Sequence, residues 1–381
     1  MSKSIAFLCV CLFTASAPAQ ESDETDAPKK RLEFGGRLLL DADYYDSFWS
    51  REDDGTTTDF EVRGTRLEVD YDFPKGWEGN LQINARIDSD DTEVDLGNAY
   101  LTYTKFDFAD VTIGKRKEPL GLERNTSALR MLLPERSMVT DELTPAKNWG
   151  VHLAQADDEF RWAASITVDD DQDDDYEESP PRAVSGKYVW APLSIESGDS
   201  QQLQIGVSGS LREWNENTFQ IRNRAEVSSA DNVVRSVRFT ADRQAIIGIE
   251  GLWQRNSLLV AAEYLVTRVE ELDGPDWDFS GYQVSASLFV TDDQHLIRNT
   301  RFRTVRPKSR SGAWELVARY SNLDAQDRGL GSIASIASIG VNYYFGRHIR
   351  VMLAYLHPDI EGSVRHTSPD GNAVTLRLQF Y

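Results

Sequence analysis

Apolar and polar residues alternate with a period of two along most of this 381-residue chain. In residues 81–88 four apolar side chains alternate with four polar ones, and residues 282–290 and 314–321 follow a similar pattern. Successive side chains of a β-strand point to opposite faces, so this period predicts strands with one apolar and one polar face. Two architectures fit such strands: a soluble sandwich with its apolar faces inward, or a transmembrane barrel with its apolar face in lipid.

Three features of the strands favour the barrel. Aromatic residues recur near strand ends, as at Trp77 and at residues 343–345, which suits the aromatic girdles of a membrane barrel. Many alternating segments reach ten residues, whereas the usual globular strand has about 5–6. Residues 374–381 form a last alternating strand that ends on Phe380 and Tyr381, and such an ending resembles the assembly signal of bacterial outer-membrane barrels.

The pattern predicts an all-β fold, a 16-stranded antiparallel transmembrane β-barrel over residues 31–381 without a domain boundary. The candidate strand cores are residues 32–46, 60–72, 80–88, 97–106, 110–115, 148–156, 160–168, 183–190, 202–213, 218–226, 235–253, 257–269, 279–290, 313–322, 334–345, 348–356 and 372–381. Bacterial single-chain barrels have an even number of strands, which favours sixteen. A barrel of that size encloses an aqueous lumen.

The first residues predict export from the cytoplasm. Lys3, a short apolar run at residues 5–15 and the small residues Ala17 and Ala19 form the pattern of a secretory signal peptide over residues 1–19. The run is shorter than the ~20 apolar residues of a spanning helix. Both cysteines lie within it, so we expect the mature chain to hold no disulfide or thiolate metal site. Residues 20–30 read as an acidic, flexible leader.

A locally basic segment stands out in a strongly acidic chain. The formal net charge is -21, yet residues 114–136 carry six basic side chains against three acidic ones. Such a segment can concentrate anions where the average surface would repel them.

The order of residues in this segment resembles that of the phosphate- and pyrophosphate-selective outer-membrane porins, the O/P-type porins. The matching residues are Gly114, Lys117, Pro119, Gly121, Leu122, Glu123, Thr126, Ser127, Glu135 and Arg136. Residues 62–67, 72–77 and 312–324 are similar to two strands and a turn of that family. The resemblance implies a homotrimeric, passive channel of the bacterial outer membrane for small anions such as phosphate. It also implies that residues 120–144 fold into the lumen as a constriction.

The resemblance further implies an anion-binding constriction. Lys117 is the expected central lysine, Thr126 and Ser127 the hydroxyl donors, and Arg136 an arginine that faces the pore. Arg124 and Arg130 are expected in the same constriction. An alternative is that these charges anchor the segment to acidic wall residues such as Asp88 and Asp95.

Further arginines are candidates for the lumen wall. Arg66 shares a face with Glu68 and Asp70, opposite apolar neighbours, and Arg86 and Arg319 pass the same test. Arg63 has the other parity, so it reaches the lumen only if the strand starts later or bulges there. These arginines either guide anions or simply belong to a polar lumen face.

Two charged runs lie outside the alternating strands. Residues 298–310 hold six basic side chains and no acidic one, which predicts a basic collar, a contact with lipopolysaccharide phosphates, or a solvated loop. Residues 169–175 hold six aspartates and suit a solvated exterior loop, because the run lacks the spacing of a calcium loop. Nucleic acid is an unsuitable partner for an exported, acidic chain.

No catalytic motif is recognisable, so we expect neither an enzyme nor a cofactor or metal site. Two alternatives to an anion channel remain at this point. One is a general or other-solute porin, in which acidic lumen residues cancel the basic ones. The other is a secreted soluble β-protein that binds or cleaves glycans. Outer-membrane lipid and lipopolysaccharide are expected partners only if the barrel spans the membrane.

Overall fold

The computed structural model describes residues 31–46, 48–49, 55–87, 92–157, 159–170, 179–194, 201–363 and 371–381. The predicted signal peptide, the acidic leader, Asp88 and residues 171–175 lie outside the described residues. The long strands are β1 (Arg31–Tyr45), β2 (Thr57–Phe73), β3 (Trp77–Ile87), β4 (Thr92–Tyr103), β5 (Asp110–Lys117), β6 (Lys147–Ala156), β7 (Phe160–Val168), β8 (Arg182–Leu193), β9 (Gln201–Glu213), β13 (Phe239–Arg255), β14 (Leu258–Glu271), β15 (Trp277–Phe289), β18 (Ala313–Asp324), β19 (Ser332–Phe345), β20 (Ile349–Gly362) and β21 (Ala373–Phe380).

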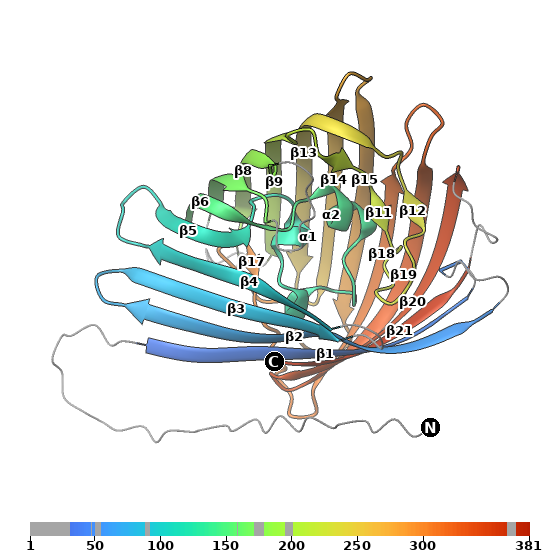
Figure 1. Ribbon diagram of the computed structural model, residues 1–381. Coiled ribbons are helices and arrows are strands. Elements are labelled where there is room, and N and C mark those ends of the chain that lie inside the picture. Colours follow the sequence, from blue (N-terminus) through green and yellow to red (C-terminus); the bar gives the residue numbers. More distant parts are fainter. Residues whose placement is uncertain are drawn as a thin grey trace, which may run out of the picture.

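These sixteen strands form one closed sheet (Figure 1). Each strand pairs antiparallel with the next long strand along the chain, and β1 pairs with β21, Leu38 opposite Phe380 and Tyr45 opposite Ala373. The predicted sixteen-stranded antiparallel barrel is therefore confirmed. None of the helices in the described part of the chain is long and apolar enough to cross a membrane.

One of the seventeen candidate strand cores is wrong. Residues 218–226 do not form a wall strand but belong to the connection from β9 to β13, which contains β10 (Thr218–Phe219), β11 (Arg222–Asn223) and β12 (Val234–Arg235). Apolar side chains of this connection, among them Ile221 and Val227, are buried in one cluster with Phe48 and Trp49. The alternation arises because these side chains pack against other parts of the chain, and not against lipid.

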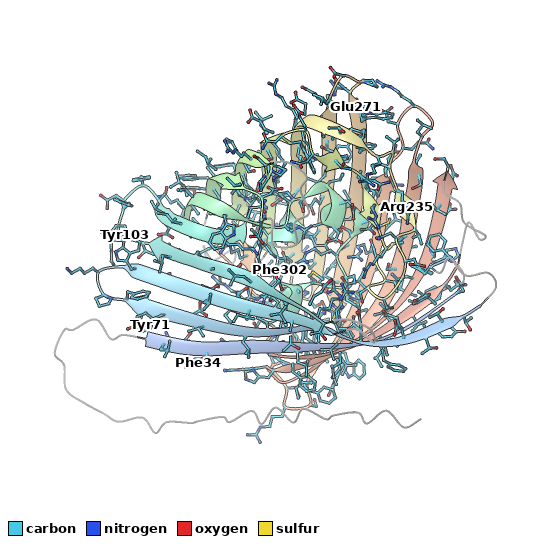
Figure 2. All side chains as sticks on the ribbon, in the orientation of Figure 1. Phe34, Tyr71, Tyr103, Arg235, Glu271 and Phe302 are labelled. Atoms are coloured by element: carbon cyan, nitrogen blue, oxygen red, sulfur yellow. The ribbon has the colours of Figure 1, made fainter. Side chains whose placement is uncertain are left out.

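The two faces of the sheet differ in polarity as a membrane barrel requires. On the outer face Phe34, Ile166, Leu211 and Ile339 are 78%, 67%, 69% and 62% exposed, and Figure 2 shows Phe34 at the outside of β1. Polar side chains of the inner face are buried, for example Gln204, Glu263, Gln283 and Ser321. A soluble sandwich would have the opposite arrangement.

The two ends of the barrel have different connections. Tight turns join β2 to β3, β13 to β14 and β19 to β20 at the end where β1 starts and β21 finishes. Short turns are periplasmic in barrels of this kind, which assigns this end to the periplasm. Two long connections, residues 118–146 and 214–238, lie at the opposite end of the barrel. Another long connection, residues 290–312, lies at the periplasmic end and contains β16 (Ile297–Arg298) and β17 (Arg301–Phe302).

Candidate functional site

The 118–146 segment contains α1 (Leu122–Asn125), the 3₁₀ turn η1 (Ala128–Arg130) and α2 (Met138–Leu143) (Figure 1). Its backbone turns at Gly121, where φ is 65° and a Cβ atom would collide with the Glu263 carboxylate of β14. The amides of Leu122 and Glu123 donate to the two oxygens of that carboxylate, at 2.9 and 3.4 Å. Glu263 therefore fixes the start of the segment to the inner face of the wall.

Helix α2 is attached to the same side of the wall. Met138, Val139 and Leu143 are buried, and a Cβ atom on Gly281 of β15 would lie 2.8 Å from a methyl group of Val139. The absence of a side chain at Gly281 thus allows the helix to approach the strand closely. Ser137 caps the helix by accepting a hydrogen bond from the amide of Thr140.

The far part of the segment contacts strands on both sides of the β1–β21 pairing. The Glu135 carboxylate accepts two hydrogen bonds from Arg63 of β2, both 2.9 Å long, and a third from Arg377 of β21. Arg350 of β20 donates to the carbonyl of Met131 at 2.7 Å. Burial alone would raise the pKa of Glu135, but the charges of Arg63 and Arg377 hold it well below its usual range.

Between this segment and the wall lies a cavity of about 1050 Å³. Thirteen basic and seven acidic side chains line it among the described residues. The basic ones are Arg37, Arg66, Lys115, Arg116, Lys117, Arg124, Arg130, Arg136, Lys147, Arg161, Lys187, Arg212 and Arg301. The cavity therefore carries an excess of positive charge within a chain of formal net charge -21.

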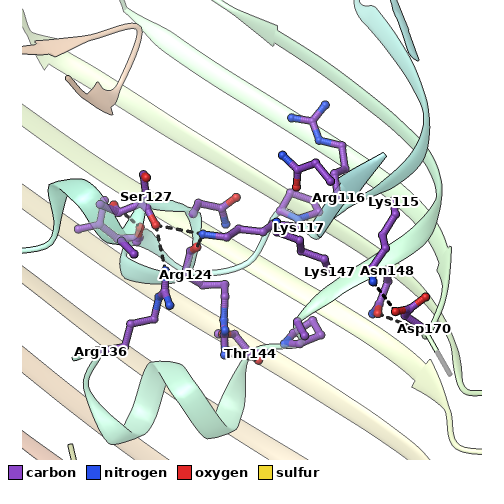
Figure 3. A pocket seen from close by; sticks show the side chains of 18 of the residues that line it. Lys115, Arg116, Lys117, Arg124, Ser127, Arg136, Thr144, Lys147, Asn148 and Asp170 are labelled. Atoms are coloured by element: carbon purple, nitrogen blue, oxygen red, sulfur yellow. Dashed lines mark hydrogen bonds and ion pairs between the residues drawn. The ribbon is translucent and has the colours of Figure 1, made fainter. Parts of the chain in front are cut away.

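Lys117 stands at the point where β5 ends and the segment begins (Figure 3). Its ammonium donates to the backbone carbonyls of Arg124, at 2.5 Å, and Thr126, at 3.0 Å. The Thr126 hydroxyl donates to the carbonyl of Leu122 at 2.9 Å. Ser127 lines the cavity, and no hydrogen bond of its hydroxyl occurs within the part of the chain described here. Lysine, threonine and serine are thus brought together, but Lys117 also holds the backbone.

The three arginines expected in the constriction differ in their surroundings. Arg124 donates to the hydroxyl of Thr144 at 2.7 Å and to three backbone carbonyls of residues 140–144, so it ties the two ends of the segment together. Arg136 donates to the carbonyl of Thr126 at 3.2 Å. Burial and the charge of Arg124 lower the pKa of Arg136 to about 10, so it stays charged at neutral pH. Arg130 donates to the carbonyl of Phe302 at 2.9 Å.

The four wall arginines all have partners on the inner side of the barrel. Arg66 donates to the side-chain oxygen of Asn84 at 2.8 Å and lines the cavity. Arg86 pairs with Glu61 at 3.2 Å, and buried Arg319 pairs with Glu123 at 3.1 Å and with Glu226. Of these four arginines only Arg66 has no carboxylate partner within the described residues.

Arg63 reaches the inner side of the barrel, although a regular alternation with Arg66 would place it on the outer face. The pairing of β2 with β3 shifts register between Val62 and Thr65, and such a bulge turns following side chains to the other face. Arg63 and Arg66 therefore both contact residues of the inner side.

Sequence reasoning missed several basic residues of the inner face. Arg377 lies between Leu376 and Leu378, so the parity test applied to Arg66 would have found it. Lys147 donates to Gln82 at 3.0 Å and lines the cavity, but it follows a proline-containing loop and has no alternating neighbours before it. Arg37 also lines the cavity, and its Nε atom is buried without a hydrogen-bond partner in the described residues.

The basic run at residues 298–310 lies in the 290–312 segment. Arg301 and Phe302 pair with Arg298 and Ile297 as a two-stranded hairpin, and Thr300, Arg301 and Phe302 line the cavity. Lys308, in contrast, is exposed beside Asp292. The run thus contributes one part to the cavity and another to the periplasmic surface.

The comparisons with known proteins agree with this architecture. The family model described as "Phosphate-selective porin O and P" matches residues 32–381. Porin O of Pseudomonas aeruginosa is 24% identical over 392 aligned residues, which cover 92% of this chain and 88% of that protein.

Solved structures of outer-membrane channels share the fold. The anion-selective porin of Comamonas acidovorans superposes with a TM-score of 0.58 at 10% identity and covers 92% of this chain and 99% of its own. The channel DcaP of Acinetobacter baumannii has a TM-score of 0.59 at 12% identity, covering 92% and 97%. OmpT of Vibrio cholerae in its trimer form has a TM-score of 0.58 at 13% identity, covering 92% and 99%.

A secreted glycan-binding or glycan-cleaving protein is not supported by any of these findings. The matched family consists of channels and not of enzymes, and its members lie in the outer membrane. Because the family model extends over the whole barrel, this chain belongs to the phosphate-selective porins O and P.

Proposed function

We propose that the protein conducts small anions passively through the barrel, with phosphate or polyphosphate-like anions as its solutes. The observation that carries this proposal is the excess of basic over acidic side chains around one cavity beside the 118–146 segment. A few charges dominate selectivity at a narrow point, because low-dielectric walls screen them poorly. Charges on exterior loops act through water across more than a Debye length of ~8 Å and matter less.

In this proposal the 118–146 segment constricts the lumen. Lys117, Arg136 and Arg66 supply positive charge, and Ser127 and Thr126 supply hydroxyl groups beside them. Arg124 and Arg130 mainly hold the segment in place, because their donors are directed at backbone carbonyls. The family assignment and the name of the Comamonas acidovorans porin support anion passage as the general activity.

We further propose that the protein assembles as a homotrimer whose apolar outer face contacts lipid and, at the exterior rim, lipopolysaccharide. The trimer form of OmpT from Vibrio cholerae and the exposed apolar side chains of the outer face support this assembly.

Reversal potentials in planar lipid bilayers under a potassium chloride gradient test the channel activity. The wild-type protein should prefer chloride to potassium, and Arg66→Gln should reduce that preference because Arg66 lines the cavity without a carboxylate partner. Arg268→Gln is the matched control, since Arg268 forms an exposed pair with Asp278 outside the cavity.

A second candidate is a general porin without anion selectivity. It is favoured by the ion pairs of Arg63, Arg86 and Arg319, which neutralise three of the four predicted wall arginines. A wild-type channel that prefers potassium in the same gradient would contradict the anion channel and favour the general porin.

A further inference from the structure

A second group of arginines, whose charges act on one another, lies in the same cavity as Lys117. Arg116 belongs to β5, Arg161 is the second residue of β7 after a short periplasmic turn, and Arg301 is at the tip of the 290–312 segment. All three line the same cavity. Three elements that are distant in the sequence thus bring their guanidinium groups to one part of the lumen.

These arginines have no carboxylate partner among the described residues. Arg116 donates to the Thr112 hydroxyl at 2.9 Å, and its guanidinium lies over the ring of Tyr100, 5.1 Å from the centroid. Arg161 and Arg301 line the cavity without a side-chain hydrogen bond or ion pair to any of the described residues. Guanidinium groups left without acceptors can bind oxyanions through paired N–H donors.

A buried hydroxyl group accompanies them. The Oγ1 atom of Thr300 is buried without a hydrogen-bond partner in the described residues, and Thr300 lines the cavity next to Arg301. Thr300 also has a φ of 57°, which is unusual for a β-branched residue, in the turn that presents Arg301 to the lumen. An unpaired buried hydroxyl costs free energy unless water or a ligand satisfies it.

The charges around the group repel one another and attract anions. Burial within the barrel and the charges of Arg161 and Arg116 lower the pKa of Arg301 to about 9, so it is still charged at neutral pH. Asp110 acts on Arg161 as an opposing charge, and Glu68 and Asp70 act on Tyr100. The group therefore offers an anion mostly N–H donors. Few carboxylates are close enough to accept a hydrogen bond from a protonated anion.

We propose that Arg116, Arg161, Arg301 and Thr300 form a second anion-binding site on the periplasmic side of the 118–146 segment. The site binds doubly charged oxyanions by charge and N–H donation and does not require a proton on the anion. Sulfate should therefore bind about as well as hydrogen phosphate, whereas chloride, with one charge, binds weakly. The site goes beyond the proposed selectivity at Lys117 and involves different residues.

Block of chloride current in planar bilayers at pH 8 tests the site. Potassium sulfate or potassium phosphate is added to one side at a time, and the side is assigned by reacting Asp276→Cys, in the turn at the opposite end, with a bulky maleimide. Both salts should block at similar concentrations and more strongly from the periplasmic side. Arg301→Gln should raise the half-blocking sulfate concentration by about tenfold, the effect of losing one charge-assisted contact of about 1.4 kcal/mol.

Matched variants separate binding from damage to the fold. Lys308→Gln lies on the same segment in an exposed pair with Asp292 and should leave the block unchanged. Arg301→Lys, which keeps the charge but loses the planar fork, should retain part of the block. Arg161→Gln repeats the test from the barrel wall, and heat-modifiable mobility on gels verifies folding for each variant.

Two results would overturn the site. One is an unchanged sulfate block in both Arg301→Gln and Arg161→Gln. The other is a wild-type channel that phosphate blocks and sulfate does not, because binding would then require the proton. Failure of the proposed function appears in a different measurement, a reversal potential that favours potassium without any oxyanion present.

Discussion

Arg63 donates two parallel hydrogen bonds to the carboxylate of Glu135, Nε to Oε1 and Nη2 to Oε2, each 2.9 Å long. Arg377 binds the same carboxylate, so one acidic residue of the 118–146 segment joins two arginines of the wall. Planar, two-point contacts of this kind fix both distance and orientation. The position of the far part of the 118–146 segment therefore depends on Glu135.

The first prediction follows from this contact. Glu135→Gln should lower the stability of the folded segment by roughly 3 kcal/mol, because it leaves buried Arg63 without its carboxylate partner and Arg377 with Asp41 alone. The expected result is a noisier open-channel current and a lower temperature for the mobility shift on gels. Glu33→Gln is the control, since Glu33 pairs with Arg31 in an exposed position. Equal behaviour of the two variants would contradict the role of Glu135.

The same carboxylate also predicts an effect of acid. The pKa of Glu135 is held below its usual range in the folded protein, so its stabilisation is complete above the unfolded value of about 4.5. It is lost only as pH falls further, through the lowered folded pKa. Current noise in the wild type should therefore be constant from pH 8 to pH 5. A rise in noise within that interval would show that another group controls the segment.

Glu142 predicts a pH dependence near neutrality. It lies in α2, lines the cavity, and accepts hydrogen bonds from the backbone of Arg222 and the side chain of Asn223, both 3.0 Å long. Burial, together with nearby Asp141, raises its pKa to about 7. A raised carboxyl pKa stabilises the fold most at low pH, and this contribution is lost as pH rises from about 4.5 through 7.

Ionisation of Glu142 adds a negative charge to the cavity, so the preference for chloride over potassium should fall as pH rises from 6 to 8. Reversal potentials at a series of pH values measure this. In Glu142→Gln the dependence should disappear, whereas Asp273→Asn, in an exterior turn, should retain it. If the chloride preference of Glu142→Gln still changes with pH at the same midpoint as in the wild type, another group is responsible.

Lys117 gives a fourth prediction. Lys117→Met should weaken phosphate block and lower the chloride preference, because it removes a positive charge at the end of β5. Lys117→Arg should retain most of the chloride preference. If both variants lose it equally, the hydrogen bonds to the carbonyls of Arg124 and Thr126 matter more than the charge. Asp273→Asn again serves as the exterior control.

Ala128 tests whether the 118–146 segment lies inside the barrel. It begins η1, two residues before Arg130, whose guanidinium donates to Phe302 of the periplasmic 290–312 segment. A cysteine at Ala128 should react slowly with a bulky external maleimide in intact cells, while Asp276→Cys should react quickly. Reaction at equal rates would place the segment outside the lumen.

The wall of the barrel could be predicted from the sequence because each strand shows its own alternation of apolar and polar residues. Alternation in residues 314–321 is sufficient to orient Arg319 inward, where the structure also has it. The long connections between wall strands could not be predicted in this way. Residues 218–226 alternate like a wall strand, since alternation does not reveal whether the apolar face meets lipid or Trp49.

The site was harder to predict for a related reason. The basic residues of the 118–146 segment are visible in the sequence, but their partners are backbone carbonyls that no residue type reveals. Arg124 is an example, because its donors bind residues 140–144 of its own segment. The grouping of Arg116, Arg161 and Arg301 depends on how β5, β7 and a periplasmic hairpin meet, which is a property of the closed barrel.

The contacts of Glu135 have a consequence for the assembly of the barrel. Arg63 lies on β2 and Arg377 on β21, on the two sides of the seam where β1 and β21 pair, and Arg377 also binds Asp41 of β1. Before the first and last strands meet, the carboxylate has only one of its two guanidinium partners within reach. Both guanidinium contacts of Glu135 therefore require the closed barrel, so the same carboxylate that positions the segment also links the first and last parts of the wall.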